Sequence, residues 1–499
     1  MKRFLGIACF MLFAIVVNAQ NITAKVIDAQ SGESLPYANI ELNGQNIISN
    51  AEGSFTIPPQ LVDDNQTLSI TFLGYSGVRM DMAELKKNQW TIKMNPAVFE
   101  LETLHISNTT PNADSIMAYV KKNLARNYKL VAEPVKNTIF YRESQTFRPQ
   151  KVNVEITKST GYKKKELDDT NKQLQGFTSK LISHPPQEFK EMLINYYTST
   201  KKVNDKPQML SKFEVAKAIQ LKDKNRAVSL KEMQEMVTGI VYKHLDSTKY
   251  YRIKSGWFGT RDTVLKPQDA KKIKTKENIQ KATSHDVAVF IHENNFTSGT
   301  HDFVTNTGIY DYFYQGAVPH GDQYVYVLKF KPRKSKAKYT GTLYISDNDY
   351  AIVKAEYELA EGKTLSGVNL KFLLGIKQSE NMARGSMVFK ENLQGGGYYL
   401  HYASQETGQY VYLNRPLKFI EIAKSDKDVA AFDLKLETNI IEKKEYFNIS
   451  RAAVSEAAFN VITNKEANYL QLESYSPSIW KEYTTVDPVQ EMKQFRVYE

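Results

Sequence analysis

The first part of the chain has alternating apolar and polar positions, the pattern of short β-strands. Ile22, Ala24 and Val26 alternate with polar residues, and similar runs follow, separated by turn residues. Successive side chains of a strand point to opposite faces, so a period of two predicts strands with one buried face. Short strands at a spacing of about 8 to 12 residues are typical of a sandwich. We therefore expect a self-contained Greek-key β-sandwich over residues 20–96.

A helical period follows the sandwich. Ile116, Val120 and Leu124 recur every four residues, which places them on one face of a helix over about residues 114–127. Residues 97–130 are therefore expected to contain a linker and this helix.

Strand patterns return in the rest of the chain. Many short alternating runs within residues 131–499 predict a large antiparallel sheet. Residues 185–250 lack clear alternation, and we predict a helical insertion there, with helices through Phe189 and over Phe213–Leu221. A third helix is predicted after Ser229, which would cap it, with Leu230, Met233, Val237 and Ile240 on one face. The polar stretch Lys163–Lys172 is predicted to be a loop. The fold class is thus mainly β, with an α+β body behind the sandwich.

The alternation of Val287, Val289 and Ile291 predicts one further strand, at the point where the body returns to β-structure.

The N-terminal residues have the three parts of a secretory signal peptide. Two basic residues precede a mainly apolar stretch that is too short to span a membrane, and the small residue Ala19 follows it. We predict a signal peptide over residues 1–19, cleavage after Ala19, and a location in the periplasm or at the outer membrane. The only cysteine, Cys9, lies in this segment, so the mature chain is expected to have no disulfide and no thiol nucleophile.

The charge of the chain is positive but dispersed. Its 66 Lys and Arg residues outnumber its 55 Asp and Glu residues, which gives a net charge of +11. Dispersed charge is typical of a solvated surface, so we predict no nucleic-acid partner. In a cell envelope the first polyanions that such a protein meets are anionic lipids and acidic glycans, and a peripheral membrane association is compatible with this charge.

Several motifs of the sandwich resemble a known module. Asp28, Gly32, Leu35–Ile40, Glu52–Phe55 and Phe72–Tyr75 are similar to the carboxypeptidase-regulatory-like domain. The resemblance implies a transthyretin-like fold at the start of an exported protein of the Bacteroidetes type. In peptidases this module is an accessory domain and not the catalyst, so the resemblance implies no peptidase activity. The chain departs from the plug-and-barrel plan of the receptors that also carry the module.

The body has resemblances of its own. Thr138–Glu143, Tyr324–Pro332, Gly341–Ile345 and Ser478–Tyr483 resemble segments of exported Bacteroidetes proteins that carry the same front module. Gly341–Glu358 is similar to periplasmic lipoprotein-carrier proteins, whose curved sheet holds acyl chains. These resemblances imply an architecture and a location, and the second implies a lipid ligand.

No stretch of the chain carries a recognised catalytic motif. His292 and Glu293 begin like the helix of a zinc protease, but Phe296 stands where the second histidine is required. His301 and Asp302 lie nearby, yet their spacing matches no known metal motif. We therefore predict no catalytic residue, no metal, no cofactor and no enzymatic activity.

Two surface features are candidate binding sites. A basic hairpin could contact anionic lipid headgroups, or it could be a solvated hairpin tip that discourages edge pairing. Its candidate residues are Lys331, Arg333, Lys334, Lys336 and Lys338.

An alternating row of tyrosines is the second feature. Tyr310, Tyr312 and Tyr314 could form an aromatic binding face for sugars or acyl chains, or could pack within the sheet.

These observations support three hypotheses. The first is a non-catalytic cell-envelope protein, with the sandwich as a docking module and the body binding a protein partner, a lipid or a glycan. The alternative is a periplasmic carrier of a lipid or another amphiphile on a curved sheet. A hydrolase with an unrecognised site is the third, and the sequence leaves the oligomeric state open.

Overall fold

The computed structural model describes residues 22–97, 111–129, 131–203, 206–223, 228–255, 258–265, 281–282, 284–320, 323–392, 396–424, 428–480, 483 and 485–497. The predicted signal peptide lies outside these residues. The chain divides into two compact units. The first comprises Met1–Phe99, Val318–His320 and Ser476–Lys493, and the second comprises Glu100–Ala317, Gly321–Tyr475 and Gln494–Glu499.

The first unit contains two small sheets, in agreement with the predicted sandwich. One sheet has the order β4-β1-β7 and the other the order β3-β2-β5-β6. Strand β1 pairs antiparallel with β4 and parallel with β7. The elements are β1 (Ile22–Asp28), β2 (Asn39–Leu42), β3 (Gln45–Ile48), β4 (Ser54–Ile57), η2 (Pro59–Leu61), β5 (Thr67–Thr71), β6 (Val78–Asp81), α2 (Met82–Lys87) and β7 (Thr91–Met94). The predicted apolar positions form the core, and Val26, Ile40, Phe55, Leu68 and Ile92 are all fully buried.

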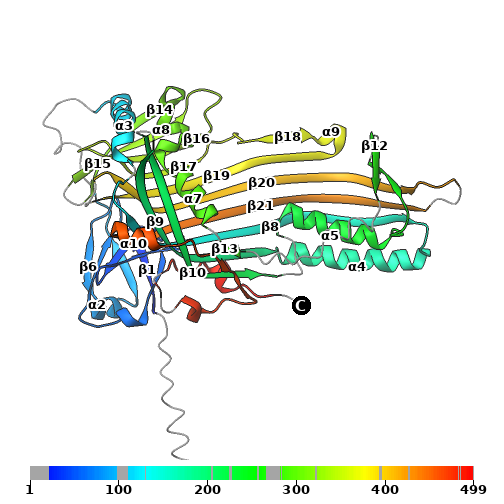
Figure 1. Ribbon diagram of the computed structural model, residues 1–499, viewed down its shortest axis with the longest axis horizontal. Coiled ribbons are helices and arrows are strands. Elements are labelled where there is room, and N and C mark those ends of the chain that lie inside the picture. The colour runs from blue at the N-terminus through cyan, green and yellow to red at the C-terminus, as the bar shows by residue number, and fades with distance from the viewer. Residues whose placement is uncertain are drawn as a thin grey trace, which may run out of the picture. The chain divides into compact units, whose positions relative to one another are not determined.

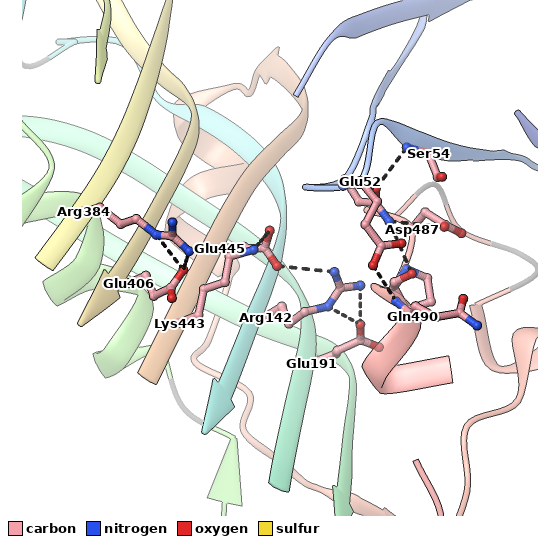
Figure 2. Close-up of polar contacts among 12 residues, drawn as sticks. Glu52, Ser54, Arg142, Glu191, Arg384, Glu406, Lys443, Glu445, Asp487 and Gln490 are labelled. Carbon is pink, nitrogen blue, oxygen red and sulfur yellow. Dashed lines mark hydrogen bonds and ion pairs between the residues drawn. The ribbon is translucent and has the colours of Figure 1, made fainter. Parts of the chain in front are cut away.

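The first unit also includes a segment from the far end of the chain. Asp487 lies 4 % exposed and accepts hydrogen bonds from Thr56 Oγ1 at 2.5 Å and Lys493 Nζ at 2.7 Å. The backbone N–H of Gln490 donates to Glu52 Oε1 at 3.0 Å (Figure 2). The segment carries η7 (Pro477–Trp480) and α11 (Gln490–Lys493). The prediction of one continuous body over residues 131–499 is therefore wrong for residues 476–493, because alternation within strands carries no signal for such a return.

The second unit is built on a 14-stranded sheet (Figure 1). Its main path is β14-β15-β16-β17-β19-β20-β21-β8-β9-β10-β23, with β11, β12 and β18 attached to it. From β15 to β10 along this path each strand pairs antiparallel with the next, whereas β10 and β23 are parallel. The strands are β8 (Val135–Ser159), β9 (Gln187–Val203), β10 (Lys206–Lys222), β11 (Tyr251–Ser255), β12 (Phe258–Leu265), β14 (Tyr310–His320), β15 (Gln323–Pro332), β16 (Tyr339–Ser346), β17 (Ile352–Leu359), β18 (Gly367–Leu370), β19 (Ile376–Glu391), β20 (Tyr398–Glu421), β21 (Val429–Ala453) and β23 (Leu470–Leu472).

Helices and short elements complete this unit. Strands β13 (Lys281–Ala282) and β22 (Ala467–Asn468) pair separately. The helical elements are α3 (Ala113–Asn127), α4 (Lys164–Ser183), α5 (Leu230–Lys243), α7 (His285–Glu293), η5 (Phe296–Ser298), α8 (Asp302–Thr305), η6 (Thr307–Ile309), α9 (Lys371–Leu374) and α10 (Glu456–Val461). Helix α3 confirms the helix that was predicted over residues 114–127.

One face of the large sheet is covered by two separate groups of helices. In β21 the even-numbered residues share a face, because side chains alternate along a strand. Among them, Tyr446 packs in a core with α3, α7 and α8. Phe432 and Ile440 pack in cores that include residues of α4. Figure 1 shows α4 and α5 alongside β8, away from α3 and α8. The two groups therefore cover different lengths of the same face.

The predicted helical insertion is largely wrong. Strands β9 and β10 take the place of the first two predicted helices. The third is confirmed as α5, the one helix among the described residues of this range. In β9 the neighbours Met192, Leu193 and Ile194 are all buried, so both faces of the strand are apolar. Burial on both faces removes the alternation on which the prediction relied.

Two further predictions of secondary structure are also corrected. The polar stretch Lys163–Lys172 begins α4 rather than a loop, because it holds one apolar residue, Leu167, and the rest of the apolar stripe, Leu174, Phe177 and Leu181, follows it at helical spacing. Residues 287–291 form part of α7 rather than a strand. The buried residues of α7 are Val287 and Phe290, three apart, which is a helical spacing.

The polar contacts of Asp487 give a first prediction. Replacing Asp487 with Ala leaves the Thr56 hydroxyl and the Lys493 ammonium without this acceptor, so we expect a loss of about 2 kcal/mol in the free energy of unfolding. Urea denaturation followed by circular dichroism and intrinsic tryptophan fluorescence measures this loss. Glu41→Ala, at an exposed position of β2, is the control and should change stability by less than about 0.5 kcal/mol. Equal stabilities of the two variants would show that the contacts of Asp487 contribute nothing to stability.

Candidate functional site

Five apolar side chains lie opposite one another across five strands of the large sheet. The register pairs Leu370 of β18 with Ile376 of β19, and Ile376 with Leu413 of β20. Leu413 pairs with Leu436 of β21, which pairs with Val152 of β8. Directly opposed residues point to the same face. We call these five residues the apolar row.

One end of the apolar row is covered. Leu436 packs against a core that joins Phe147 and Ile440 of the sheet to Leu181 of α4 and Met233 of α5. Two residues further along the same face, the opposed pair Leu434 of β21 and Val154 of β8 packs in a core with Leu174 of α4. Helices α4 and α5 therefore shield the part of the row on β21 and β8 from solvent.

The other end of the apolar row is open. Leu370 is 37 % exposed, and Val368, two residues before it on the same face, is 53 % exposed. Ile376 and Leu413 are partly exposed. A contiguous apolar surface that remains accessible marks a binding region more often than an isolated exposed side chain does. We call Leu370, Ile376 and Leu413 the open half of the row, and Val368 extends the same apolar surface along β18.

The opposite face of the same strands is polar. Lys377 Nζ lies 5.5 Å from the centre of the Tyr410 ring, and Lys371 Nζ lies 4.2 Å from the centre of the Tyr412 ring. The Tyr410 hydroxyl donates to Glu437 Oε1 at 2.6 Å. The two faces thus differ sharply in chemistry at the same point along the strands.

A charged belt separates the apolar row from the aromatic core on the same face. Lys190 Nζ lies 3.9 Å from Glu143 Oε1, and Lys444 Nζ lies 3.0 Å from Glu442 Oε1. Burial raises the pKa of the Glu143 carboxyl, and the neighbouring Lys190 only partly opposes this. The belt ends the continuous apolar surface on the side of α7.

A buried ionic network lies on the other face of the central strands (Figure 2). Arg142 Nη2 lies 2.6 Å from Glu191 Oε1, and Arg142 Nη1 lies 3.5 Å from Glu445 Oε2. All three side chains are at most 3 % exposed. Burial favours a raised pKa for Glu445, but Lys443 at 3.0 Å and Arg142 outweigh it and lower that pKa below its usual value. The network pairs buried charges of opposite sign, and so has the character of a structural cross-link between β8, β9 and β21.

The two histidines that the sequence analysis considered as metal ligands, His292 and His301, lie in different environments. His301 is 4 % exposed and packs between Phe296, Phe303 and Tyr357. Burial lowers its pKa to about 4, so its ring is neutral near pH 7. His292 lies in the last turn of α7. Within the described part of the chain, no group of three or more His, Cys, Asp or Glu residues is placed to hold a metal ion.

Three of the five candidate basic residues make contacts within the protein. Lys331 Nζ lies 4.9 Å from the centre of the Phe313 ring, and Arg333 Nη2 donates to the Gly308 carbonyl at 2.7 Å. Lys338 Nζ donates to the Thr364 carbonyl at 2.8 Å. Lys334 and Lys336 are exposed. Contact of this hairpin with anionic lipid stays a prediction.

The predicted aromatic face is corrected for two of its three tyrosines. Tyr310 is 1 % exposed and donates its hydroxyl to Asp302, and Tyr312 is 8 % exposed and donates to the Phe303 carbonyl. Tyr314 is partly exposed and packs against Tyr326. The alternation placed Tyr310 and Tyr312 on one face of a strand correctly, but that face is the core that α8 covers.

The apolar row was missed by the sequence reasoning. Its signal was present in the alternating pairs Val368 and Leu370 on one strand and Val411 and Leu413 on another. Five strands come into register only in the folded sheet, so the row itself could not be seen. Alternation also does not distinguish a covered apolar face from an open one.

Comparison with known proteins does not assign a family. No protein-family model matches the chain, and no curated protein matches it. A LolA superfamily protein from Nitrosomonas europaea aligns over 65 % of this chain and 92 % of its own, with 9 % identity and a TM-score of 0.18. A DUF1329 family protein from Desulfovibrio piger aligns over 70 % and 98 %, with 10 % identity and a TM-score of 0.18. Similarity at this level carries no functional conclusion. In the described part of the chain, no helix is both long and apolar enough to span a membrane.

The buried network predicts a large and specific stability effect. Arg142→Ala removes the guanidinium from buried Glu191 and leaves buried Glu445 with Lys443 alone, so we expect a loss of about 3 to 5 kcal/mol in the free energy of unfolding. The control is Arg384→Ala, which removes an ion pair with Glu406 (Figure 2) in which Arg384 is 61 % exposed. This variant should lose less than about 1 kcal/mol in the free energy of unfolding. Chemical denaturation of both variants measures the difference. Similar losses in the two would show that the buried network is not the stronger contact.

His301 predicts a pH dependence of stability. Its folded pKa of about 4 lies below the usual 6.5, so the folded state takes up the proton less readily than the unfolded chain. Its contribution is therefore present above about pH 6.5 and is lost as the pH falls towards 4, by up to about 3 kcal/mol. His301→Gln should flatten the stability profile in this window, whereas His184→Gln, at an exposed position, should leave it unchanged. An unaltered profile for His301→Gln would contradict this assignment.

Proposed function

We propose that this protein is a non-catalytic component of the cell envelope whose body binds an amphiphilic molecule, such as a lipid, along the apolar row. The observation that carries the proposal is a row of five opposed apolar side chains that helices cover at one end and leave open at the other. A purely structural sheet has no need of an apolar face that continues beyond its helical cover.

The dimensions of the open half suit an alkyl chain. Neighbouring strands lie about 4.8 Å apart, so Leu370, Ile376 and Leu413 present about 10 Å of apolar surface across three strands. Each methylene that leaves water contributes about 0.8 kcal/mol. An alkyl segment that lies across these strands would gain several such contributions and would cover the side chains that are now exposed.

A polar group for the head of an amphiphile lies beside the row. Arg415 follows Leu413 by two residues on β20 and therefore shares its face. One of its nitrogens, Nη2, donates to the Ser255 carbonyl at 3.0 Å, which fixes the guanidinium against β11. A guanidinium has five N–H donors and pairs well with phosphate or carboxylate. The row and Arg415 together match a ligand with an apolar chain and an anionic head.

The other parts of the proposal rest on the sequence. Export follows from the predicted signal peptide, and the sandwich is proposed as a docking module for an envelope partner. The absence of catalysis is proposed because no catalytic motif was recognised in the sequence. The face described above supports the carrier hypothesis more directly than binding of a protein partner, because its chemistry is that of an alkyl chain with one charged end.

A matched pair of variants tests the lipid-binding proposal. Leu413→Gln places an amide in the middle of the row, whereas Lys435→Gln changes an exposed side chain on the opposite face of the neighbouring strand. We expect native mass spectrometry of the full chain from cell envelopes to show a bound amphiphile. The bound fraction should fall about tenfold in Leu413→Gln, for a loss of about 1.4 kcal/mol, and stay unchanged in Lys435→Gln.

Two results would overturn the proposal. One is a wild-type protein that carries no amphiphile and takes none up from a supplied phospholipid or fatty acid. The other is equal retention in the two variants, provided that circular dichroism shows both to be folded.

A further inference from the structure

The turn between β18 and β19 exposes apolar side chains to an unusual degree. Phe372 is 104 % exposed and Leu373 is 72 % exposed, which are among the highest values for large apolar residues in the described chain. Both lie in α9, the single turn that joins the two strands. We call Phe372 and Leu373 the apolar tip. Exposure of a Phe and a Leu side by side calls for an explanation, because contact of apolar surface with water is unfavourable.

The apolar tip is held by backbone geometry. Gly375 ends α9 with a positive φ of 64°, and its N–H donates to the Lys371 carbonyl at 3.0 Å. The N–H of Asn414 donates to the Gly375 carbonyl at 2.8 Å, which ties the turn to β20. A Cβ at position 375 would lie 2.1 Å from the Asn414 carbonyl oxygen, so no other residue fits here without a shift. The sequence thus builds a defined turn that presents Phe372 and Leu373 outward.

The surroundings of the apolar tip are cationic and aromatic. The segment from Gly367 to Ser379 contains Lys371 and Lys377 and no Asp or Glu. These two lysines lie over the rings of Tyr412 and Tyr410, behind the tip. Apolar side chains at the end, with lysine and tyrosine behind them, are the arrangement of segments that enter the boundary between lipid headgroups and acyl chains.

We infer that the apolar tip inserts into the surface of an anionic lipid bilayer, with Phe372 and Leu373 below the headgroups and Lys371 and Lys377 among the phosphates. The opposite charges are complementary, because the segment has two cations and no anion. The tyrosine rings reach the same level as the lysines and add the amphipathic side chains that this boundary favours.

The size of the apolar tip argues against a protein partner. A stable protein interface buries about 800 Å² on each side, whereas one buried aromatic side chain supplies about 150 to 250 Å². Two protruding side chains therefore cover only part of what a protein partner or a second copy of this chain needs. A bilayer surrounds an inserted side chain on all sides and needs no matching surface.

The inference goes beyond the proposed function and does not depend on it. Phe372 and Leu373 lie outside the apolar row, so the apolar tip can enter a bilayer whether or not the row holds an amphiphile. The variants for the two proposals are correspondingly different. Loss of vesicle binding with intact retention of amphiphile would assign the tip alone, and Leu413→Gln tests the row alone.

Vesicle co-sedimentation tests the inference with the full chain. Vesicles of phosphatidylcholine with phosphatidylglycerol should bind the wild type. The double variant Phe372→Ser with Leu373→Ser should bind them with an affinity that is lower by about tenfold or more. Val461→Ser is the matched control, because Val461 is also an apolar side chain in the second unit, 78 % exposed, and should not alter binding. Lys371→Gln with Lys377→Gln should reduce the preference for anionic over neutral vesicles by about tenfold.

A fluorescent label separates insertion from misfolding and from self-association. Cys9 is the only cysteine, so Phe372→Cys in a Cys9→Ser background carries an environment-sensitive dye at the apolar tip alone. Its emission should shift to the blue with anionic vesicles and not with higher protein concentration, and the same dye at Val461→Cys should not respond. A blue shift that depends on protein concentration without vesicles would overturn the inference, and so would equal vesicle binding by wild type and the double variant.

Discussion

The second unit depends on the alternation of side chains along three very long strands. Strands β8, β20 and β21 run for 25, 24 and 25 residues, and β21 stays in continuous register with β20 over most of its length. A shift of one residue would exchange the two faces and remove Tyr446, Ile440 and Phe432 from the cores that the helices cover. The register therefore decides where the helices pack, where the ionic network lies and which face carries the apolar row.

The two faces of the large sheet carry different kinds of contact. On one face, helices bury apolar side chains in two regions. They leave uncovered the end of the apolar row that lies on β18, β19 and β20. On the other face, Arg142 joins two carboxylates that would be costly to bury alone. The stable cross-link and the accessible apolar surface thus lie on opposite sides, and a ligand at the row would leave the cross-link intact.

Much of the fold could be predicted from local patterns, and the errors have clear causes. The sandwich strands and α3 were predicted because their apolar residues repeat with one period and one buried face. Strands β9 and β10 were missed because Leu193 and its neighbours are buried on both faces. The start of α4 was missed because Leu167 is its only apolar residue among many charged ones. The tyrosine pattern was recognised, but burial of Tyr310 depends on α8, which the sequence did not place. The apolar row needed the pairing of five strands, and pairing between distant strands is not encoded in any one segment.

The central claim is that the apolar row, and not the polar face behind it, holds an amphiphile. Photo-crosslinking of the full chain with a fatty acid that carries a diazirine in its alkyl chain tests this directly, with the sites mapped by mass spectrometry. The account predicts labels on Leu370, Ile376 and Leu413. Labels confined to the opposite face, at Tyr410 and Lys435, or spread evenly over both faces, would contradict it.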